Sequence, residues 1–310
     1  GNDSRFYLEK VEGAQHLVTK LWNMCRFMLM NIDEPKIDIE MPKAKTLSDK
    51  WFLNSTNYYV KQMNDTLTNY QFSAAAELLR SFTWDSLADW YLEIAKIEGD
   101  KSEILNYVLN TILKLWHPFM PFVTETIWQE VYENSLLMVE KWPKLTKALP
   151  DELDTRLEFP LLKDVVTSIR FLRAEKNIEP AKKVSVVIVC IKEKTLLDEN
   201  AALIKGLARV GELTITNDES EKSAQSSSAV VGGVTIHLDL AGAIDVDAEK
   251  ARLQKEIDHV TPYITSLEKK LGNAGFVDSA PEEVVAKEKE KLEEGKNKLE
   301  KLEEQFNFLS

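Results

Sequence analysis

The stretch HLVTKLWNMCRF, residues 16–27, carries two stripes of side chains on one predicted helix. An apolar stripe contains Leu17, Val18, Leu21 and Cys25. It belongs to a longer apolar series with steps of three or four residues: Tyr7, Val11, Ala14, Val18, Leu21, Cys25 and Met28. Such spacing is typical of a helix that buries one face. The stretch therefore predicts an amphipathic helix packed onto other helices.

The second stripe is polar and aromatic, and it contains His16, Lys20, Asn23 and Phe27. Each helical residue turns by about 100°, so Lys20 lies about 200° from the apolar stripe. Lysine binds phosphate, asparagine reads base edges and phenylalanine stacks on bases. The stripe thus predicts a surface for single-stranded RNA, with Arg26 as a further phosphate contact. The pattern alone leaves a structural role open, in which Phe27 packs on a neighbouring helix and Lys20 is solvated.

Further helices are predicted on both sides of this stretch, from residue 4 to about 134. After the prolines at 35 and 42, Thr46 and Asp49 have the spacing of a capping box, which predicts a second helix through about Met63. A third is expected over about 73–96, a fourth over 102–116, and a fifth from Pro121, where the missing N–H costs nothing. Five such helices predict a helical bundle over residues 1–150.

The pattern changes after Pro150. LLKDVVTSIRFLRAEKN predicts a helix, KKVSVVIVCI a buried strand, and LLDENAALIKGLAR a helical stretch. ELTIT and GVTIHLDL predict two more strands, and the polar stretch NDESEKSAQSSSA between them predicts a flexible loop. Residues 151–244 are therefore predicted to form a small α/β module, which links the bundle to the last segment.

The last segment, residues 245–310, has an apolar seam in each of two predicted helices. The first seam steps by four and three residues: Leu253, Ile257, Val260, Ile264, Leu267 and Leu271. The second continues after GNAGFVDSAP: Val285, Glu288, Leu292, Gly295, Leu299, Leu302, Phe306 and Leu309. Heptad seams joined by a glycine-containing turn predict an antiparallel coiled-coil hairpin. The predicted fold class is thus mainly α: a bundle, a small α/β module and this hairpin.

Composition narrows the function classes. The 310 residues carry a net charge of -12, so RNA or DNA cannot be held by the whole surface and any contact must be a local patch. The two cysteines, Cys25 and Cys190, lie in apolar runs and predict buried thiols in a reducing compartment. No apolar stretch approaches the ~20 residues that a membrane span needs, and the N-terminus lacks the basic-then-apolar pattern of a signal peptide. We expect a cytoplasmic chain without membrane or DNA partners.

Catalytic and metal sites are not predicted. No glycine-rich phosphate loop follows a strand. The four histidines, at 16, 117, 237 and 259, lack metal-ligand spacing, and His117 suits a structural role beside Pro118. We therefore expect no cofactor, no metal and no catalytic residue in this chain.

Two further groups of basic residues are candidate phosphate contacts. One group flanks the predicted hairpin seam or its tip: Arg252, Lys255, Lys269 and Lys270. The hairpin has eleven Lys and Arg against sixteen Asp and Glu, so a plain solvated coil stays open for this group. The other group lies close together in the sequence: Arg170, Arg173, Lys182 and Lys183. This second group could equally be cations favoured at a helix C-terminus.

Several stretches together resemble the C-terminal part of the valyl-tRNA synthetase family. KLWNMCRFMLMN is similar to the first helix of its anticodon-binding domain, and HPFMPFVTETIWQ to a motif shared with the isoleucine and leucine enzymes. IRFLRAEKNIEPAKK resembles its linker. AGAIDVDAEKARLQKEI and KKLGNAGFVDSAPEEVVAKEKEKL resemble its coiled-coil arm, which is the specific part. The similarity runs in order along nearly the whole chain.

The resemblance implies a role in aminoacylation. The family is a class I aminoacyl-tRNA synthetase, whose catalytic domain uses ATP and Mg²⁺. Neither its HIGH nor its KMSKS signature is present here, so we expect a fragment that does not activate valine alone. The bundle would hold the anticodon of tRNA(Val) at Lys20, Asn23 and Phe27, the arm would lie against the tRNA elbow, and the catalytic and editing domains of the parent chain would be partners. The alternatives are a protein-interaction scaffold using the hairpin, or the equivalent fragment of an isoleucine or leucine enzyme.

Overall fold

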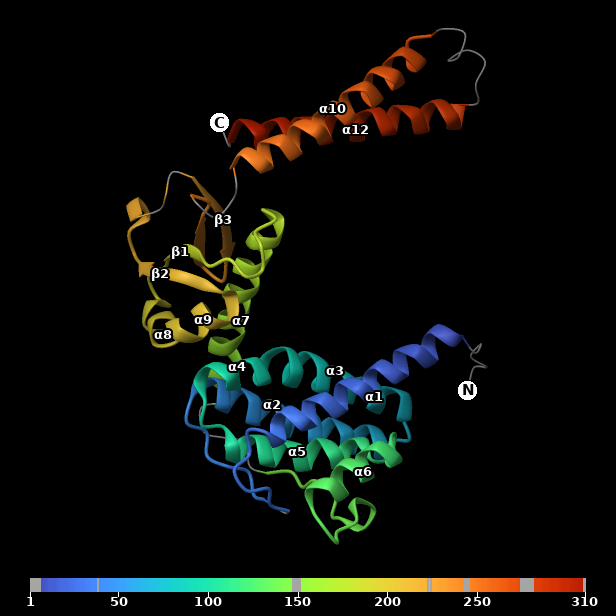
Figure 1. Ribbon diagram of the computed structural model, residues 1–310, viewed down its shortest axis with the longest axis vertical. Helices are drawn as coiled ribbons and strands as arrows, with labels where there is room; N and C mark the ends of the chain where they lie inside the picture. Colours follow the sequence, from blue (N-terminus) through green and yellow to red (C-terminus); the bar gives the residue numbers. More distant parts are fainter. Residues whose placement is uncertain are drawn as a thin grey trace. The chain divides into compact units, whose positions relative to one another are not determined.

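A computed structural model gives the fold (Figure 1). The structure describes residues 7–37, 39–146, 152–221, 223, 225–241, 246–273 and 282–308. The chain divides into two compact units. One consists of residues 1–168, 191–210 and 231–234, and the other of residues 169–190, 211–230 and 235–310. The predicted domain limits near 150 and 244 both lie outside the described residues, so they stay predictions.

The first unit contains the predicted helical bundle. Its helices are α1 (Leu8–Leu29), α2 (Leu47–Thr68), α3 (Phe72–Ser81), η1 (Phe82–Tyr91), α4 (Leu92–Glu98), α5 (Ser102–Trp116) and α6 (Pro121–Val131), followed by the short η2 (Leu137–Val139). The predicted limits of α5 and the start of α6 at Pro121 are confirmed. So is the capping box, in which Thr46 Oγ1 accepts from the Asp49 N–H and the Asp49 carboxylate accepts from the Thr46 N–H.

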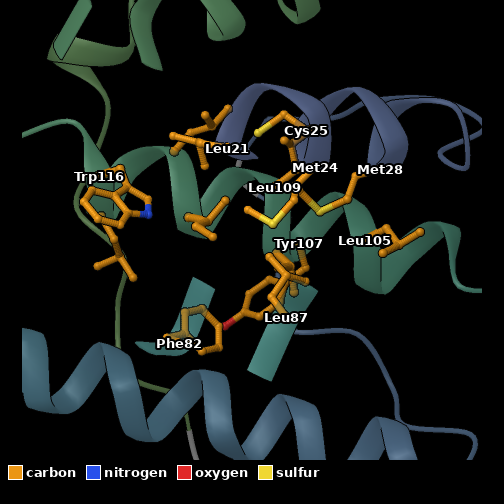
Figure 2. Packing of buried hydrophobic residues seen from close by; sticks show 14 of the residues in the cluster. Leu21, Met24, Cys25, Met28, Phe82, Leu87, Leu105, Tyr107, Leu109 and Trp116 are labelled. Atoms are coloured by element: carbon orange, nitrogen blue, oxygen red, sulfur yellow. The ribbon is translucent and has the colours of Figure 1, made fainter. Parts of the chain in front are cut away.

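Helix α1 contributes the middle and end of its predicted apolar stripe to the core. Leu21, Cys25 and Met28 are buried and face the side chains of α5 and η1 (Figure 2). The start of the stripe was predicted wrongly, because Tyr7 and Val11 are 47% and 45% exposed. Figure 1 shows the reason: the first turns of α1 extend past the other helices of the bundle.

The third predicted helix is continuous but changes its geometry. Its central part, η1, is a π-helix of ten residues between α3 and α4. The wider turn of a π-helix, with i→i+5 hydrogen bonds, suits the buried side chains Phe82, Leu87 and Tyr91, which are five and four residues apart. Thr83 is also buried, and its hydroxyl oxygen accepts from Trp116 Nε1 of α5 at 2.9 Å. The bundle core and this bond hold η1 in place.

A buried ionic network joins the start of α2 to the α4–α5 turn. Lys101 Nζ lies 2.7 Å from Asp49 Oδ1 and 2.6 Å from Glu98 Oε2, and the Lys101 side chain is 4% exposed. Tyr91 donates its hydroxyl to Asp49 Oδ1 at 2.8 Å. Burial and the nearby Asp49 carboxylate raise the Tyr91 pKa far above its ordinary value. Asp49, the N3 residue of the α2 capping box, is therefore also the anion of a buried pair.

The α/β part contains α7 (Glu152–Glu175), β1 (Val184–Val189), α8 (Lys194–Glu199), α9 (Ala201–Ala208), β2 (Val210–Thr216), η3 (Glu219–Glu221), β3 (Ser226–Val231) and β4 (Val234–Asp239). The sheet order is β2-β1-β4-β3, with β1 and β4 antiparallel and Val187 opposite His237. The predicted strands and helices are confirmed, although α7 begins well before residue 161.

The flexible loop predicted over residues 217–229 is wrong for its last four residues. Ser226–Val231 form β3, and Gly232 and Gly233 connect it to β4 with φ of 55° and 81°. Two consecutive residues with positive φ are typical of a tight hairpin turn, which brings β3 beside β4. The serine-rich strand lies at the edge of the sheet, where exposed polar side chains are tolerated.

The last two helices, α10 (Val246–Leu271) and α12 (Glu282–Phe308), pack along each other (Figure 1). Leu253, Val260, Ile264 and Leu302 are buried between them. Lys270 Nζ lies 3.0 Å from Glu288 Oε2, and Lys296 Nζ lies 2.6 Å from Glu268 Oε1. The end of α10 thus meets the start of α12. The turn between the helices, and Leu309 of the predicted seam, lie outside the described residues.

Candidate nucleic-acid interface

The polar stripe of α1 forms one wall of a groove of about 430 Å³, which we call the α1 groove. The other wall comes from η1 and α4. The lining residues are His16, Thr19, Lys20, Asn23, Met24 and Phe27 from α1, and Trp84, Ala88, Leu92, Glu93 and Lys96 opposite. Four predicted RNA contacts, His16, Lys20, Asn23 and Phe27, therefore line one hollow.

Lys20 is held across the α1 groove by two partners on η1. Its Nζ lies 3.5 Å from the centroid of the Trp84 ring and 3.4 Å from Asp89 Oδ1. The lysine side chain is 26% exposed and the aspartate 55%. A cation over an indole face and beside a carboxylate is stabilised by both. An incoming phosphate must therefore compete with Asp89 for this lysine.

Phe27 contributes both to the core and to the groove. It is half-buried and packs against the bundle core, yet it also lines the hollow. Lys96 Nζ lies 5.2 Å from the centroid of its ring. The structural and the RNA-binding interpretations of Phe27 are thus compatible, because the core fixes the ring while the groove leaves part of it accessible. Asn23 and His16 are exposed beside it.

Arg26 lies apart from this group. It lines a different hollow together with Trp22, Met30 and Glu130, on the α6 side of α1. Positions 26 and 27 are about 100° apart on a helix, so neighbouring residues face different surfaces. The structure therefore does not bring Arg26 into the α1 groove with the other predicted contacts.

The α1 groove combines the kinds of side chain that bind single-stranded nucleic acid. Two lysines, Lys20 and Lys96, can meet phosphates, although Lys96 is also paired with Glu93. Trp84 and Phe27 offer aromatic surface, and Asn23 offers an amide donor and acceptor at the rim. Unpaired bases bind by stacking on aromatic rings and by hydrogen bonds to their edges. The groove can therefore hold unstacked nucleotides in a chain whose net charge is negative.

Sequence reasoning missed the second wall. Trp84, Ala88 and Lys96 belong to the stretch FTWDSLADWYLEIAK, which was predicted as an ordinary helix. An α-helical wheel misplaces Trp84 and Ala88 relative to Lys96, because η1 is a π-helix whereas Lys96 lies in α4. The available signal was the five-residue step from Phe82 to Leu87, which is longer than the three- and four-residue steps of an α-helix face.

The predicted elbow contacts on the hairpin differ in their surroundings. Lys255 and Lys269 are exposed on α10, and the side chain of Arg252 lies outside the described residues. Lys270 is paired with Glu288, whose other oxygen lies 3.0 Å from Lys291. These two lysines lower the pKa of Glu288, Lys291 most strongly. Lys270 of α10 therefore has a structural role, because it forms an ion pair with Glu288 of α12.

Arg173 does not belong to the surface patch that was predicted from Arg170, Arg173, Lys182 and Lys183. Arg173 is buried, and its guanidinium donates to the carbonyl oxygens of Glu179 and Lys182 at 3.1 and 2.7 Å. It thus fixes the turn after α7 and is not a surface cation. Arg170, Lys182 and Lys183 are exposed, and a phosphate contact there stays a prediction.

Other candidate groups have structural roles. His117 Nδ1 and Thr124 Oγ1 lie 2.9 Å apart, which joins the end of α5 to α6. Both cysteines are buried, as predicted, and burial raises the pKa of the Cys25 thiol to about 12. Within the described ranges, His, Cys, Asp and Glu form no cluster that could hold a metal ion. None of the helices described there is long and apolar enough to cross a membrane.

Comparisons with known families match two parts of the chain. The model for the anticodon-binding domain of tRNA ligase matches residues 49–188. The model for the valyl tRNA synthetase tRNA binding arm matches residues 245–310. The first match contains η1 and α4, which form one wall of the α1 groove, and the second contains α10 and α12.

Curated relatives match 94–100% of the chain. It is 39% identical to a valine–tRNA ligase of Carboxydothermus hydrogenoformans over 100% of the chain. It is 37% identical to one of Bacillus thuringiensis over 94%, and 35% identical to one of Listeria innocua over 98%. The chain spans only 35–36% of the length of these relatives, and it matches their C-terminal part. The predicted resemblance is confirmed.

Proposed function

Because this chain corresponds to the C-terminal part of the valyl-tRNA synthetase family, we propose that it binds tRNA(Val) and holds the anticodon loop in the α1 groove. The observation that carries this proposal is the groove itself, where Lys20, Asn23 and Phe27 face Trp84 across one hollow. Anticodon bases would leave their stack and rest on the aromatic surface, while the lysines neutralise the neighbouring phosphates.

The longer protein would supply the chemistry. Its relatives are valine–tRNA ligases, and the catalytic and editing domains of such a parent would be partners of this chain. The parent reaction would use ATP and Mg²⁺ to join valine to its tRNA, in the cytoplasm. This chain covers 35–36% of the length of those relatives, their C-terminal part. Its contribution would be to bind and orient the tRNA.

We propose that α10 and α12 form a coiled-coil arm that contacts the tRNA elbow. The match to a tRNA binding arm over residues 245–310 and the buried seam between the two helices support this proposal. Lys255 and Lys269 are exposed and would meet phosphates. The acidic balance of the segment means that this contact would be weak without the bundle.

Binding of anticodon stem–loop RNAs tests the groove proposal. We expect the 310-residue chain to bind a hairpin with a valine anticodon more tightly than one with an unrelated anticodon, and both affinities to fall with salt. Phe27→Ala should weaken binding by about 1–3 kcal/mol, because stacking on the ring is lost. Equal affinity for both hairpins, in wild type and variant, would contradict the proposal.

Two controls separate function from folding. Because Phe27 also packs against the core, its variant must show a wild-type unfolding transition before its binding is interpreted. Asn23→Ala provides an independent test, since Asn23 is exposed and its loss leaves the core intact. Asn23→Ala should reduce the ratio of affinities for the valine and the unrelated anticodon more than it reduces the affinity for either hairpin.

The scaffold alternative concerns the hairpin. Deleting residues 247–310 should lower the affinity for full-length tRNA(Val) and leave affinity for the anticodon stem–loop unchanged. If the deletion leaves tRNA affinity unchanged and removes a protein partner, the hairpin is a docking element. The valine-specific arm match favours the valine enzyme over the isoleucine or leucine alternatives.

A further inference from the structure

A second hollow of about 600 Å³ lies elsewhere in the first unit and shares no lining residue with the α1 groove. We call it the lysine-rimmed cavity. Its floor is one face of α5, formed by Tyr107, Asn110, Thr111 and Lys114. These positions have the i, i+3, i+4, i+7 spacing of a single helix face. Residues 39–41 and 141–146 form its walls.

The wall at 141–146 is fixed by side chains of α2. Asn57 exchanges two hydrogen bonds with the Thr146 backbone: its amide donates to the carbonyl oxygen and its oxygen accepts from the N–H, both at 3.0 Å. Trp142 donates its indole N–H to Asn64 Oδ1 at 2.6 Å. Asn57 and Asn64 are two helical turns apart on the same face of α2. The cavity is therefore preformed and does not depend on a mobile segment.

The cavity has a positive rim in a chain with a net charge of -12. Lys141 and Lys144 are exposed at its edge, and Lys114 lies at its end, 3.6 Å from Glu140. Glu40 is the one acidic residue among those that line it. Two solvent-facing lysines beside a partly enclosed hollow favour a ligand with a negative group at the rim.

The floor contains a buried acceptor without a donor. The Asn110 amide nitrogen lies 2.8 Å from the Tyr132 hydroxyl oxygen and 2.9 and 3.1 Å from the carbonyl oxygens of Lys36 and Asn106, and these acceptors fix the orientation of the amide. Asn110 Oδ1 is buried and receives no hydrogen bond from the described residues. An unpaired buried acceptor is costly, so a donor supplied by a ligand or by an ordered water would be favourable there.

We propose that the lysine-rimmed cavity binds a nucleotide, with the phosphate at Lys141 and Lys144 and the base inside. The apolar surface of Trp142 and Tyr107 suits a base, and its amino group would donate towards Asn110, directly or through one water. The volume lies in the range of small-ligand sites. The nucleotide is either free or an unpaired nucleotide of an RNA strand, since both have the same phosphate and base.

Titration of the 310-residue chain with AMP, adenosine and inorganic phosphate tests the site. The probe is the indole NMR signal of Trp142, assigned with Trp142→Phe. AMP should shift this signal at saturable concentration, and adenosine and phosphate should bind more weakly, because each supplies half of the contacts. The double variant Lys141→Glu, Lys144→Glu should weaken AMP binding by about tenfold or more, since two charge-assisted contacts become repulsive.

Matched controls locate the binding. Lys61→Glu on α2 changes the same kind of exposed charge outside the cavity and should leave AMP binding unchanged. A failure of the α1 groove proposal is distinguishable, because that proposal is tested with anticodon stem–loops and this one with the Trp142 signal. If a short unpaired RNA moves the Trp142 signal and AMP does not, the source is an RNA strand. If neither moves it, or if the double variant binds like wild type, the inference is wrong.

Discussion

The pair between Lys20 and Asp89 gives the sharpest prediction for the α1 groove. A phosphate that binds Lys20 must first replace the carboxylate 3.4 Å away. Both side chains are partly exposed, and such pairs contribute about 0.2–1 kcal/mol. The substitution Asp89→Asn removes this competition and should therefore tighten RNA binding by about 1.4- to fivefold.

Fluorescence anisotropy with a labelled valine anticodon stem–loop measures this gain. The matched control is Asp85→Asn, which removes an equal charge from the same helix at a carboxylate that accepts from the Ser81 hydroxyl at 2.8 Å, whereas Lys20 pairs with Asp89. Removing any negative charge from η1 weakens the repulsion of RNA. The gain in affinity that is due to the Lys20–Asp89 pair is therefore the gain of Asp89→Asn minus the gain of Asp85→Asn. In a Lys20→Ala background, Asp89→Asn should give no more than the control. Equal gains from Asp89→Asn and Asp85→Asn in the wild-type background would refute the reasoning.

Three further predictions concern stability and reactivity. Lys101→Met leaves the Asp49 carboxylate buried without its cation and should lower the free energy of unfolding by about 3–5 kcal/mol in a urea titration. Cys25 should resist iodoacetamide in the native chain and react in urea, because burial raises its pKa to about 12; equal rates in both conditions would contradict its burial. Glu288 should titrate below an ordinary glutamate in carbon-13 NMR, and Lys291→Ala should raise its pKa. Its lowered native pKa stabilises the packed pair of helices α10 and α12 above the ordinary glutamate pKa, and this contribution is lost as pH falls through the native value.

Local patterns predicted most of the helices, because their signals are contained in a few neighbouring residues. The capping box at Thr46 and Asp49 and the proline at 121 marked helix starts that the structure confirms. The exposed start of α1 could not be predicted in this way. Tyr7 continues the apolar spacing, yet it is 47% exposed, because the sequence around it does not tell how far the neighbouring helices reach along α1.

The missed elements depended on tertiary contacts. A serine-rich segment has little strand preference, yet β3 forms because the Gly232–Gly233 turn places it beside β4. The π-helical geometry of η1 depends on how its side chains pack in the core. For the candidate site, the α1 stripe was readable from one helix, whereas Trp84 and Asp89 reach it from a segment more than fifty residues away.

The indole NMR signal of Trp84 tests the central claim most directly. Trp84 lines the α1 groove, whereas Trp22 is exposed on another surface of α1 and serves as an internal control. Adding the valine anticodon stem–loop should shift the Trp84 signal, assigned with Trp84→Phe, and leave the Trp22 signal in place. A stem–loop that binds without moving the Trp84 signal would contradict the account, because the RNA would then lie outside the groove.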